Sequence, residues 1–425
     1  MTRMAENHLS RREFLNWLGA AGLGALCGGA LLGDLGCASG LVAAPGAPGA
    51  PGAADAQTSL PSREAMFYTS FRESALNCSA CHDLEAPRVL YCHTGHGTNH
   101  VRCQLCPKQC IISDGSRGDC GVRENRGGKL HSLVYGNACA VNVDPIEKKP
   151  FYHFLPASRA FSIAAAGCNL HCLYCQNWAI SQNPPESVDS VDLPPEAVVA
   201  SALQSGSHSI AYTYSEPTIF FEYMLDTARL AKQQGLRNVV ISAGYINLEP
   251  LHLLCQEVDA IKIDLKGFNE GFYKEVCDGT LQPVLEAIKA IHAWGVHLEI
   301  VNLVVPTLND DEGELRALSE WVVDELGPDV PLHFSRFGPQ YKLTNLPPTP
   351  VQALERARQA ALDAGVKYAY IGNVPGHEAN HTYCPNCGEI LIGRLGFAVQ
   401  AYHISGGACE FCGQLIAGVW ASPAA

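Results

Sequence analysis

The sequence predicts an α/β fold, a full or partial (β/α) barrel of the TIM type with a cysteine-rich module on each side. Short apolar runs alternate with amphipathic helical stretches in the middle of the chain, and most of the 19 cysteines gather in tight clusters. A chain of 425 residues has room for one large domain and one or two small ones. We expect an export signal with a linker, an N-terminal cysteine-rich metal-binding module, the barrel and a C-terminal zinc-ribbon-like module, at residues 1–56, 57–158, 159–376 and 377–425.

Apolar runs mark the predicted strands of the barrel. Each run is mostly apolar, as expected of parallel strands that are buried on both faces. Their alternation with helices favours a barrel over a sandwich, and in such barrels the chemistry lies at the carboxyl ends of the strands. The predicted strands are 160–166, 208–214, 237–243, 260–265, 297–305, 331–337 and 368–374, and the predicted helices include 218–235, 281–294, 311–326 and 350–364.

The beginning of the chain predicts a targeting segment. Arg11 and Arg12 precede a glycine-rich apolar run, which is typical of a twin-arginine export signal and makes a poor membrane-spanning helix. A Pro/Gly/Ala stretch with no means of packing follows. We expect export to the periplasm or envelope and no transmembrane helix in the mature chain. A cytoplasmic chain and lipidation of Cys37 are the alternatives.

The net charge and the spacing of the cysteines limit the kinds of partner and of metal site that we expect. A formal net charge of −13 would repel phosphate backbones, so we expect no nucleic-acid partner. Disulfide frameworks belong mostly to short chains that lack a large core, whereas Cys-x2-Cys pairs suit thiolates that converge on a metal. The cysteine clusters therefore indicate several metal sites.

A loop with three cysteines follows the first predicted strand. Cys168, Cys172 and Cys175 lie within eight residues, close enough to bind three corners of a cuboidal iron–sulfur cluster. Such clusters are normally held by four thiolates, and a metal with an open coordination position is typical of a catalytic site. The spacing therefore predicts a reactive [4Fe–4S] cluster, and a plain electron-transfer cluster is the alternative.

The Cys-x3-Cys-x2-Cys loop, with Tyr174 before its last cysteine, resembles the radical S-adenosylmethionine (SAM) superfamily. The resemblance implies that an external one-electron donor reduces the cluster. SAM is then cleaved to methionine and a 5′-deoxyadenosyl radical, which abstracts hydrogen from a substrate. It also implies an oxidoreductase of anaerobic metabolism that uses a [4Fe–4S] cluster and SAM as cofactors, with Tyr174 near the cofactor.

Other strand ends carry residues that fit the same resemblance. Ser215 and Glu216 occupy the place of a Gly-Gly-Glu-Pro-like segment that binds the amine of SAM, although Tyr and Ser replace the two glycines. Asp264 and Lys266 resemble the Asp-Leu-Lys of glycyl-radical activating enzymes and would bind ribose and carboxylate. We expect His333 to line the pocket. A helix N-terminal carboxylate for Glu216 and an ion pair for Asp264 and Lys266 are the alternatives.

Two Cys-x2-Cys knuckles near the end of the chain predict a zinc ribbon. Each knuckle is followed by glycine, which permits the tight turn that such a site needs. Four ligands close the coordination sphere, so we expect a structural role, with a rubredoxin-like iron or disulfides as the alternatives. The ligands would be Cys384, Cys387, Cys409 and Cys412.

A third cysteine group precedes the barrel. Its Cys-x2-Cys-x3-Cys spacing reverses that of the barrel loop, and a further cysteine supplies a fourth thiolate. A full set of four indicates a closed site that holds zinc or a second cluster. Its members are Cys103, Cys106, Cys110 and Cys120.

Several segments together narrow the resemblance. Residues 103–123, 144–154 and 168–177, with the C-terminal ribbon, resemble the radical SAM member of the AmmeMemoRadiSam system, which is related to pyruvate formate-lyase activating enzymes. This resemblance implies Memo-like and AMME-region proteins as partners and a protein substrate, as in glycyl-radical activases. A small-molecule substrate is the alternative. For residues 144–154 we expect only a structural lead-in to the first strand.

Cys78, Cys81 and His82 match the short Cys-x2-Cys-His motif of c-type haem attachment. We favour an unligated or disulfide-linked loop, or another metal site, over haem. At the level of the whole protein, the rival class is a multi-cluster electron-transfer protein of the cell envelope without SAM chemistry. A metal-stabilised binding module is a further alternative. Neither of these needs a barrel mouth with polar residues at its strand ends.

Overall fold

The computed structural model describes residue 60, residues 62–71 and residues 99–420. The expected twin-arginine segment, the linker, Cys37 and the Cys78–His82 motif lie outside these residues. Within them, no helix combines the length and the apolar character that crossing a membrane requires.

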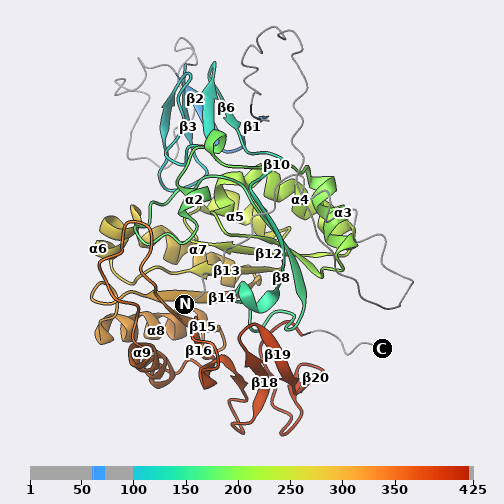
Figure 1. Ribbon diagram of the computed structural model, residues 1–425, viewed down its shortest axis with the longest axis vertical. Coiled ribbons are helices and arrows are strands. Elements are labelled where there is room, and N and C mark those ends of the chain that lie inside the picture. Colours follow the sequence, from blue (N-terminus) through green and yellow to red (C-terminus); the bar gives the residue numbers. More distant parts are fainter. Residues whose placement is uncertain (1–59, 61, 72–98, 421–425) are drawn as a thin grey trace, which may run out of the picture. The chain divides into compact units, whose positions relative to one another are not determined.

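Parallel strands form an open barrel, which confirms the predicted α/β core. In the described chain the main sheet has eight strands, and all are parallel except β8, which pairs antiparallel with β9. Strands β8 and β16 are its two edges, so the barrel is partial rather than closed (Figure 1). The strands, in chain order, are β8 Ala140–Pro145, β9 Arg159–Ala164, β11 Ser209–Tyr212, β12 Arg237–Ser242, β13 Ala260–Asp264, β14 His297–Val304, β15 Leu332–Arg336 and β16 Ala369–Gly372.

The helices that connect these strands pack against one another around the outside of the sheet (Figure 1). Local signals set their ends. The Asp311 side chain accepts the Glu314 N–H at the start of α8, and Gly365, with φ of 103°, ends α9. The helices are α2 Trp178–Ser181, α3 Pro195–Gln204, α4 Phe221–Gln233, α5 Leu248–Cys255, α6 Glu270–Phe272, α7 Gln282–Ala293, α8 Glu312–Leu326 and α9 Val351–Ala364, with a π-helical turn at Tyr273–Cys277.

The segment 146–154 closes the amino-terminal end of the barrel. Its side chains Ile146, Phe151 and Phe154 are fully buried, and they pack on small residues near the beginnings of the strands. The sequence predicted only a lead-in here, but the segment is an apolar plug. The small residues that make room for it are Ala160, Ala211, Val239 and Ala260.

The N-terminal module consists of two small antiparallel sheets and lies against the loops at the carboxyl ends of the barrel strands. Arg123 and Glu222 of α4, each 2% exposed, form a buried ion pair of 3.1 Å that ties the module to the barrel. A Cβ added to Gly167 would lie 2.8 Å from the Cys120 carbonyl oxygen, so only glycine permits this approach. The strands are β1 Arg63–Glu64, β2 Tyr68–Phe71, β3 His100–Cys103, β4 Ile111–Ser113, β5 Arg123–Arg126 and β6 Lys129–Ser132; β7 Asn137–Ala138 pairs with β10 Val191–Asp192.

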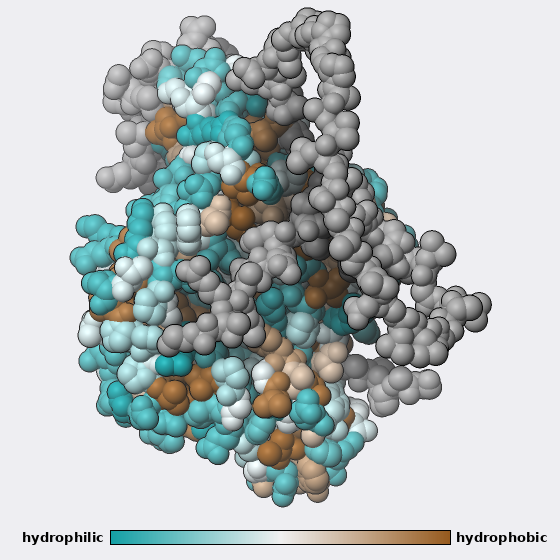
Figure 2. Space-filling model, viewed as in Figure 1, coloured by the Kyte–Doolittle hydropathy of each residue, from teal (hydrophilic) through white to brown (hydrophobic). Residues whose placement is uncertain are grey.

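The C-terminal module packs on the opposite, plugged end of the barrel. The buried Arg394 guanidinium donates to the Tyr152 carbonyl oxygen at 2.8 Å and stacks over its ring at 4.0 Å. The buried residues of the module share one core with Tyr152 and Tyr370 at the end of the barrel. Leu395 and Leu415 are 63% and 74% exposed. Figure 2 shows hydrophobic patches on the part of the surface where Figure 1 places this module. Its strands are β17 Thr382–Tyr383, β18 Ile390–Leu395, β19 Ala398–Tyr402, β20 Ile404–Ser405 and β21 Ala408–Cys409.

Candidate functional site

The three-cysteine loop leaves the carboxyl end of β9 and is held in place by backbone hydrogen bonds. The His171 and Leu173 N–H groups each donate, at 2.9 Å, to the carbonyl oxygens of Cys277 and Val276 in the π-helical turn. The Leu170 N–H lies 3.4 Å from the Cys168 Sγ, a donor to sulfur within the loop. These hydrogen bonds fix the conformation of the loop.

Cys172 of this loop is buried, and Cys168 and Cys175 are partly buried. Burial, and then the charges of Glu216 and Cys172, raise the pKa of Cys168 well above its usual range. A hydrogen bond with Cys277 and burial do the same to the pKa of Cys172. Because a metal ligand must be the thiolate, deprotonation at this site requires the positive charge of bound iron.

Lys266, at the end of β13, supplies a second positive charge beside the loop. Its Nζ lies 3.0 Å from the Asp264 carboxylate, which the Lys262 ammonium also contacts. Burial would lower the pKa of Lys266, but Asp264 and the Cys172 thiolate together raise it, so the ammonium stays charged. Burial would raise the pKa of Asp264, yet the two lysines hold it at about 2. Asp264 and Lys266 are thus brought to the mouth as an ion pair.

Glu216 is held by the protein at the end of β11. Its Oε1 accepts from the Thr218 N–H at 3.0 Å and from the Ser242 hydroxyl at 2.6 Å, while Oε2 accepts from the Ala243 N–H at 2.9 Å. This is the helix N-terminal arrangement that the sequence left as an alternative. The Ser215 hydroxyl donates to the Ala165 carbonyl oxygen at 2.6 Å. Both side chains fasten the ends of neighbouring strands around the loop.

Tyr174 lies inside the mouth, packed between Phe272 and Phe337. Its hydroxyl is 3.6 Å from the Sγ of Cys277, a fully buried cysteine that adjoins Cys172. Sequence reasoning missed Cys277, because a single cysteine on a turn has no spacing pattern that marks it.

His333 does not join this group, which corrects the expectation that it lines the cofactor pocket. Its Nε2 lies 2.7 Å from Glu299, and its ring packs between Tyr152 and Tyr370. Burial lowers its pKa although Glu299 opposes the shift. His333 therefore belongs to the buried polar layer that holds the plug. Alternation along a strand predicts which residues share a face, but not how deep in the barrel a residue lies.

A further carboxylate, Asp144, lies inside the barrel and was given no role from sequence. It accepts from Lys149 at 2.6 Å, from Ser162 at 2.9 Å and from the Tyr214 hydroxyl. Burial would raise the pKa of Asp144, but Lys149 and the hydrogen bonds hold it at about 2. Tyr214 has a φ of 67°, a left-handed conformation that is rare for an aromatic residue. Such strain is typical of functional strand ends.

Comparison with known proteins agrees with this geometry. The sequence pattern of the radical SAM superfamily matches residues 162–318, which include the three-cysteine loop, Glu216 and Lys266. The uncharacterized protein MJ0808 of Methanocaldococcus jannaschii is 49% identical over 320 residues, which cover 75% of this chain and 95% of that protein. The chain belongs to the radical SAM superfamily.

Other matches are more distant. The pyruvate formate-lyase 1-activating enzyme of Escherichia coli K12 is 24% identical over 208 residues, 45% of this chain and 84% of that enzyme. A domain of the pyruvate-formate lyase-activating enzyme from Bacteroides vulgatus, a solved structure, is 17% identical with a TM-score of 0.36. It covers 39% of this chain and 100% of that domain.

The radical SAM family implies a [4Fe–4S] cluster and SAM, and the residues of the loop fit a cluster. Among the described residues, two groups of three or more potential ligand atoms lie within 4.8 Å of one another, and the sulfurs of Cys168, Cys172 and Cys175 are not one of them. A tetrahedral site around one metal needs sulfurs about 3.8 Å apart, given metal–sulfur bonds of about 2.3 Å. Wider spacing suits a cluster, in which each thiolate binds a different iron.

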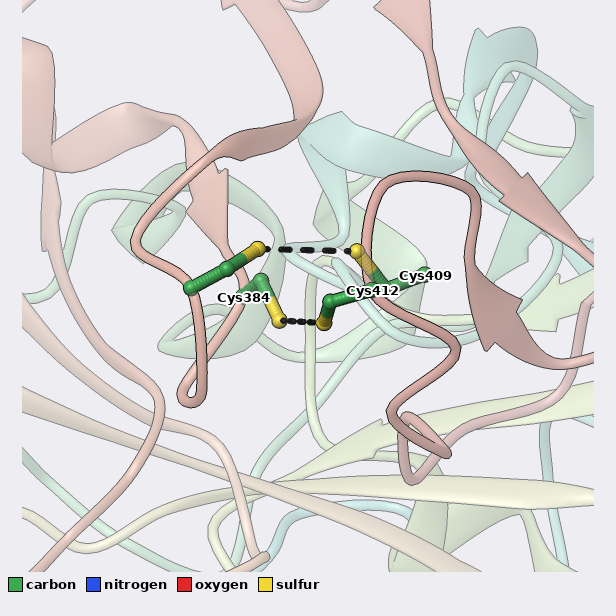
Figure 3. A group of neighbouring side chains, drawn as sticks. Cys384, Cys409 and Cys412 are labelled. Carbon is green, nitrogen blue, oxygen red and sulfur yellow. Dashed lines mark hydrogen bonds between the residues drawn. The ribbon is translucent and has the colours of Figure 1, made fainter.

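The C-terminal cysteines form one of the two compact groups, so they could hold a metal. The sulfurs of Cys384 and Cys412 lie 3.6 Å apart, and those of Cys387 and Cys409 lie 3.8 Å apart (Figure 3). Both separations match the edge of a tetrahedron around one ion and are far longer than a disulfide bond of about 2.05 Å.

The other compact group, Asp119, His171 and Asp278, is an ion-pair network. Lys108 occupies its centre, with its Nζ 2.7 Å from Asp278 and 3.2 Å from Asp119. The Nε2 of His171 lies 3.0 Å from Asp119. The network joins the N-terminal module to the residues beside Cys172 and Cys277.

Proposed function

We propose that this radical SAM protein cleaves SAM reductively at a [4Fe–4S] cluster held by Cys168, Cys172 and Cys175. The observation that carries the proposal is a loop of three cysteines at the carboxyl end of the first parallel strand, with the Lys266 ammonium beside it. When bound and reduced, the cluster supplies the electron that splits SAM into methionine and a 5′-deoxyadenosyl radical, which abstracts hydrogen from a substrate.

The residues around the loop orient the cofactors in this proposal. Lys266 stays protonated beside Cys172, where its charge offsets that of the thiolates and attracts the SAM carboxylate. Asp264 fixes the position of that ammonium group. Glu216 and Ser215 hold the ends of the strands, and Glu216 Oε2, which accepts a hydrogen bond from the Ala243 N–H, would also accept one from the amine of SAM. Tyr174 and its aromatic neighbours exclude water from the same space.

Loss of SAM cleavage in cysteine variants tests the proposal. Anaerobically reconstituted protein with dithionite and SAM should release 5′-deoxyadenosine, and Cys168→Ala, Cys172→Ala and Cys175→Ala should each abolish the release. Cys255→Ala, at the end of α5, is the matched control and should leave the release unchanged. Undiminished release in all three loop variants, measured by chromatography, would show the assignment to be wrong.

We further propose a protein substrate, as the names of the activating-enzyme relatives suggest for those proteins. Memo-like and AMME-region proteins are the partners that the AmmeMemoRadiSam resemblance proposes. Deuterium transferred from a labelled candidate protein into 5′-deoxyadenosine would identify the substrate. Transfer from a small metabolite instead would favour the alternative substrate class, and redox-active clusters with no SAM cleavage would favour an electron carrier.

We also propose that the C-terminal group holds zinc in a closed, structural site. The sulfur separations of 3.6 and 3.8 Å support a single tetrahedral ion. With four protein ligands, the ion has no position for a substrate. Metal analysis of the purified chain should find about one zinc that survives loss of the iron–sulfur cluster.

A further inference from the structure

We propose that Cys103, Cys106, Cys110 and Cys120 hold a second iron–sulfur cluster, which passes electrons to the cluster of the three-cysteine loop. The site itself is argued from the geometry of the N-terminal module alone. The electron-transfer role rests on the proposed function.

A small cavity lies where the N-terminal module meets the barrel, and all four cysteines line it. The four cysteines come from different parts of the module. Cys103 ends β3, Cys106 and Cys110 lie in the following turn, and Cys120 precedes β5. Apolar side chains, including Ile112 and Ile219, complete the wall. A largely apolar cavity that is lined by four cysteine sulfurs is an environment in which an iron–sulfur cluster is shielded from solvent.

The sulfur spacing separates this site from a zinc site. The four sulfurs do not form a group within 4.8 Å of one another, whereas those of the C-terminal module do. The loop of Cys168, which the family assigns to a cluster, shares this wider spacing. Among the described residues, the C-terminal cysteines are therefore a compact set, whereas the N-terminal cysteines and those of the loop are not.

A buried hydrogen-bond donor without a partner belongs to Arg123, one of the residues that line the cavity. Arg123 is 2% exposed and pairs through its terminal nitrogens with Glu222 and Met66. Its Nε–H is buried without any hydrogen-bond partner. The Asp119 N–H lies 3.4 Å from the Cys110 Sγ, as the Leu170 N–H does from Cys168. A cluster carries negative charge and accepts hydrogen bonds on its sulfurs, so it would satisfy the Arg123 Nε–H.

The second site adjoins the catalytic loop directly. Asn169, the residue after Cys168, lines the cavity, and the Cys120 carbonyl oxygen touches Gly167. Lys108 and Asp119, on the module, reach His171 and Asp278 beside the loop. The segments that carry the two cysteine groups are therefore in direct contact, which suits electron transfer between them.

Four thiolates leave no iron open to a substrate, so the second cluster is suited to electron transfer. A low-potential one-electron donor, such as a reduced ferredoxin or flavodoxin, reduces this cluster. The cluster is reoxidised when it passes the electron to the loop cluster, and one electron is consumed for each SAM that is cleaved.

Counting acid-labile sulfide tests the site without using SAM. The full chain is reconstituted anaerobically with iron and sulfide, and the Cys168→Ala/Cys172→Ala/Cys175→Ala variant is compared with the parent. The variant should keep about half of the sulfide, roughly four per chain, and show a cluster signal in electron paramagnetic resonance after reduction. The complementary Cys103→Ala/Cys106→Ala variant should also keep about half.

Sulfide near zero in the loop variant, with zinc in place of iron, would overturn the second cluster. A mononuclear iron in the C-terminal module would add iron but no sulfide, so it cannot imitate the expected result. If a variant fails to fold, the parent chain still decides, because two clusters require about eight sulfides and one requires about four. A parent with two clusters but no SAM cleavage would refute the proposed function and keep this site.

The relay is tested in Cys106→Ala, whose loop cluster is intact. Reduction of the loop cluster by a protein donor should slow, while the loop cluster, once reduced, should still cleave SAM at the parental rate. An unchanged rate of reduction by the protein donor would overturn the relay.

Discussion

The two four-cysteine groups of this chain contain similar knuckles but lie in different surroundings. The C-terminal group is compact, with sulfur separations of 3.6 and 3.8 Å, and Cys387 and Cys412 are exposed. The N-terminal group is wide and lines a small cavity beside the catalytic loop. The spacing of cysteines along a sequence therefore does not decide what they bind, because the separation of the sulfurs in space depends on the scaffold.

Position in the barrel agrees with this difference. The wide group lies at the carboxyl ends of the strands, where barrel chemistry is located, and the compact group packs on the plugged amino-terminal end, where conserved architecture serves stability. Electron transfer needs closeness to the reacting cluster, whereas a structural ion does not.

Removing the compact metal site should have the largest effect on stability. Zinc binding to small modules contributes on the order of 10 kcal/mol to folding, and this module exposes several large apolar side chains. Cys384→Ala/Cys412→Ala should lose the metal and become sensitive to proteolysis after residue 376, while SAM cleavage persists. A variant that keeps its metal and its protease resistance would show that packing on the barrel, not the ion, holds the module.

Removing the charge of Glu299 should have the next largest effect on stability, because this carboxylate holds the plug segment 146–154 in place. Its carboxylate accepts from the Tyr152 and His153 N–H groups at 2.9 and 2.8 Å and contacts His297 and His333. Although burial alone would raise its pKa, the two histidines hold that pKa well below its usual range.

Glu299→Ala should therefore lower the free energy of unfolding by about 4 kcal/mol, since it leaves buried donors unpaired. The matched control is Glu325→Ala, whose ion pair with Lys289 is 44% and 42% exposed and should matter by less than about 1 kcal/mol. Denaturant unfolding measures both, and equal losses would show that the plug does not depend on this carboxylate.

The sequence predicted the barrel well because its signals are local. Apolar runs placed every parallel strand, and the three-cysteine loop, Asp264 and Lys266 fell at strand ends as expected of parallel strands. It could not predict the plug, because Ile146, Phe151 and Phe154 show no period and acquire a role only when distant strands assemble around them.

The hydrogen-bond partners of the side chains could not be predicted from the sequence either. Glu216 matched a cofactor motif, yet its oxygens are held by Thr218, Ser242 and Ala243, which come from two different strand ends. The alternation of side chains along its strand could not show how deep in the barrel His333 lies. Arg123 and Cys277 carried no motif at all. These assignments depend on contacts between elements that are remote in the chain.

Acid should weaken the plugged end of the barrel before the cysteine-lined end. Burial lowers the pKa of His153 to about 4, although Glu299 opposes the shift, and its Nδ1 contacts the Ala417 carbonyl oxygen of the C-terminal module. In the unfolded chain histidine has a pKa of about 6.5, so below that pH the unfolded state binds a proton that the folded state does not.

Stability should therefore fall as the pH drops from about 6.5 to about 4, by up to about 3 kcal/mol, at about 1.4 kcal/mol per pKa unit. His153→Gln should flatten this dependence while lowering stability at neutral pH. An unchanged slope in chemical denaturation across this range would assign the acid sensitivity to other groups.

The smallest effect is expected at the ion-pair network that joins the N-terminal module to the catalytic loop. Asp119 and His171 are 37% and 35% exposed, and His171 holds the pKa of Asp119 at about 2. Because the pair is exposed to solvent and screened, Asp119→Asn should lower the free energy of unfolding by less than about 1 kcal/mol.

Salt distinguishes this pair from Glu299. Raising the ionic strength to about 1 M should remove most of the difference between Asp119→Asn and the parent, because the screening length then falls to about 3 Å, comparable with the contact itself. The loss in Glu299→Ala should persist, since its partners are buried. A large, salt-resistant loss in Asp119→Asn would mean that the network supports the cavity of the N-terminal module, and iron content would then fall with it.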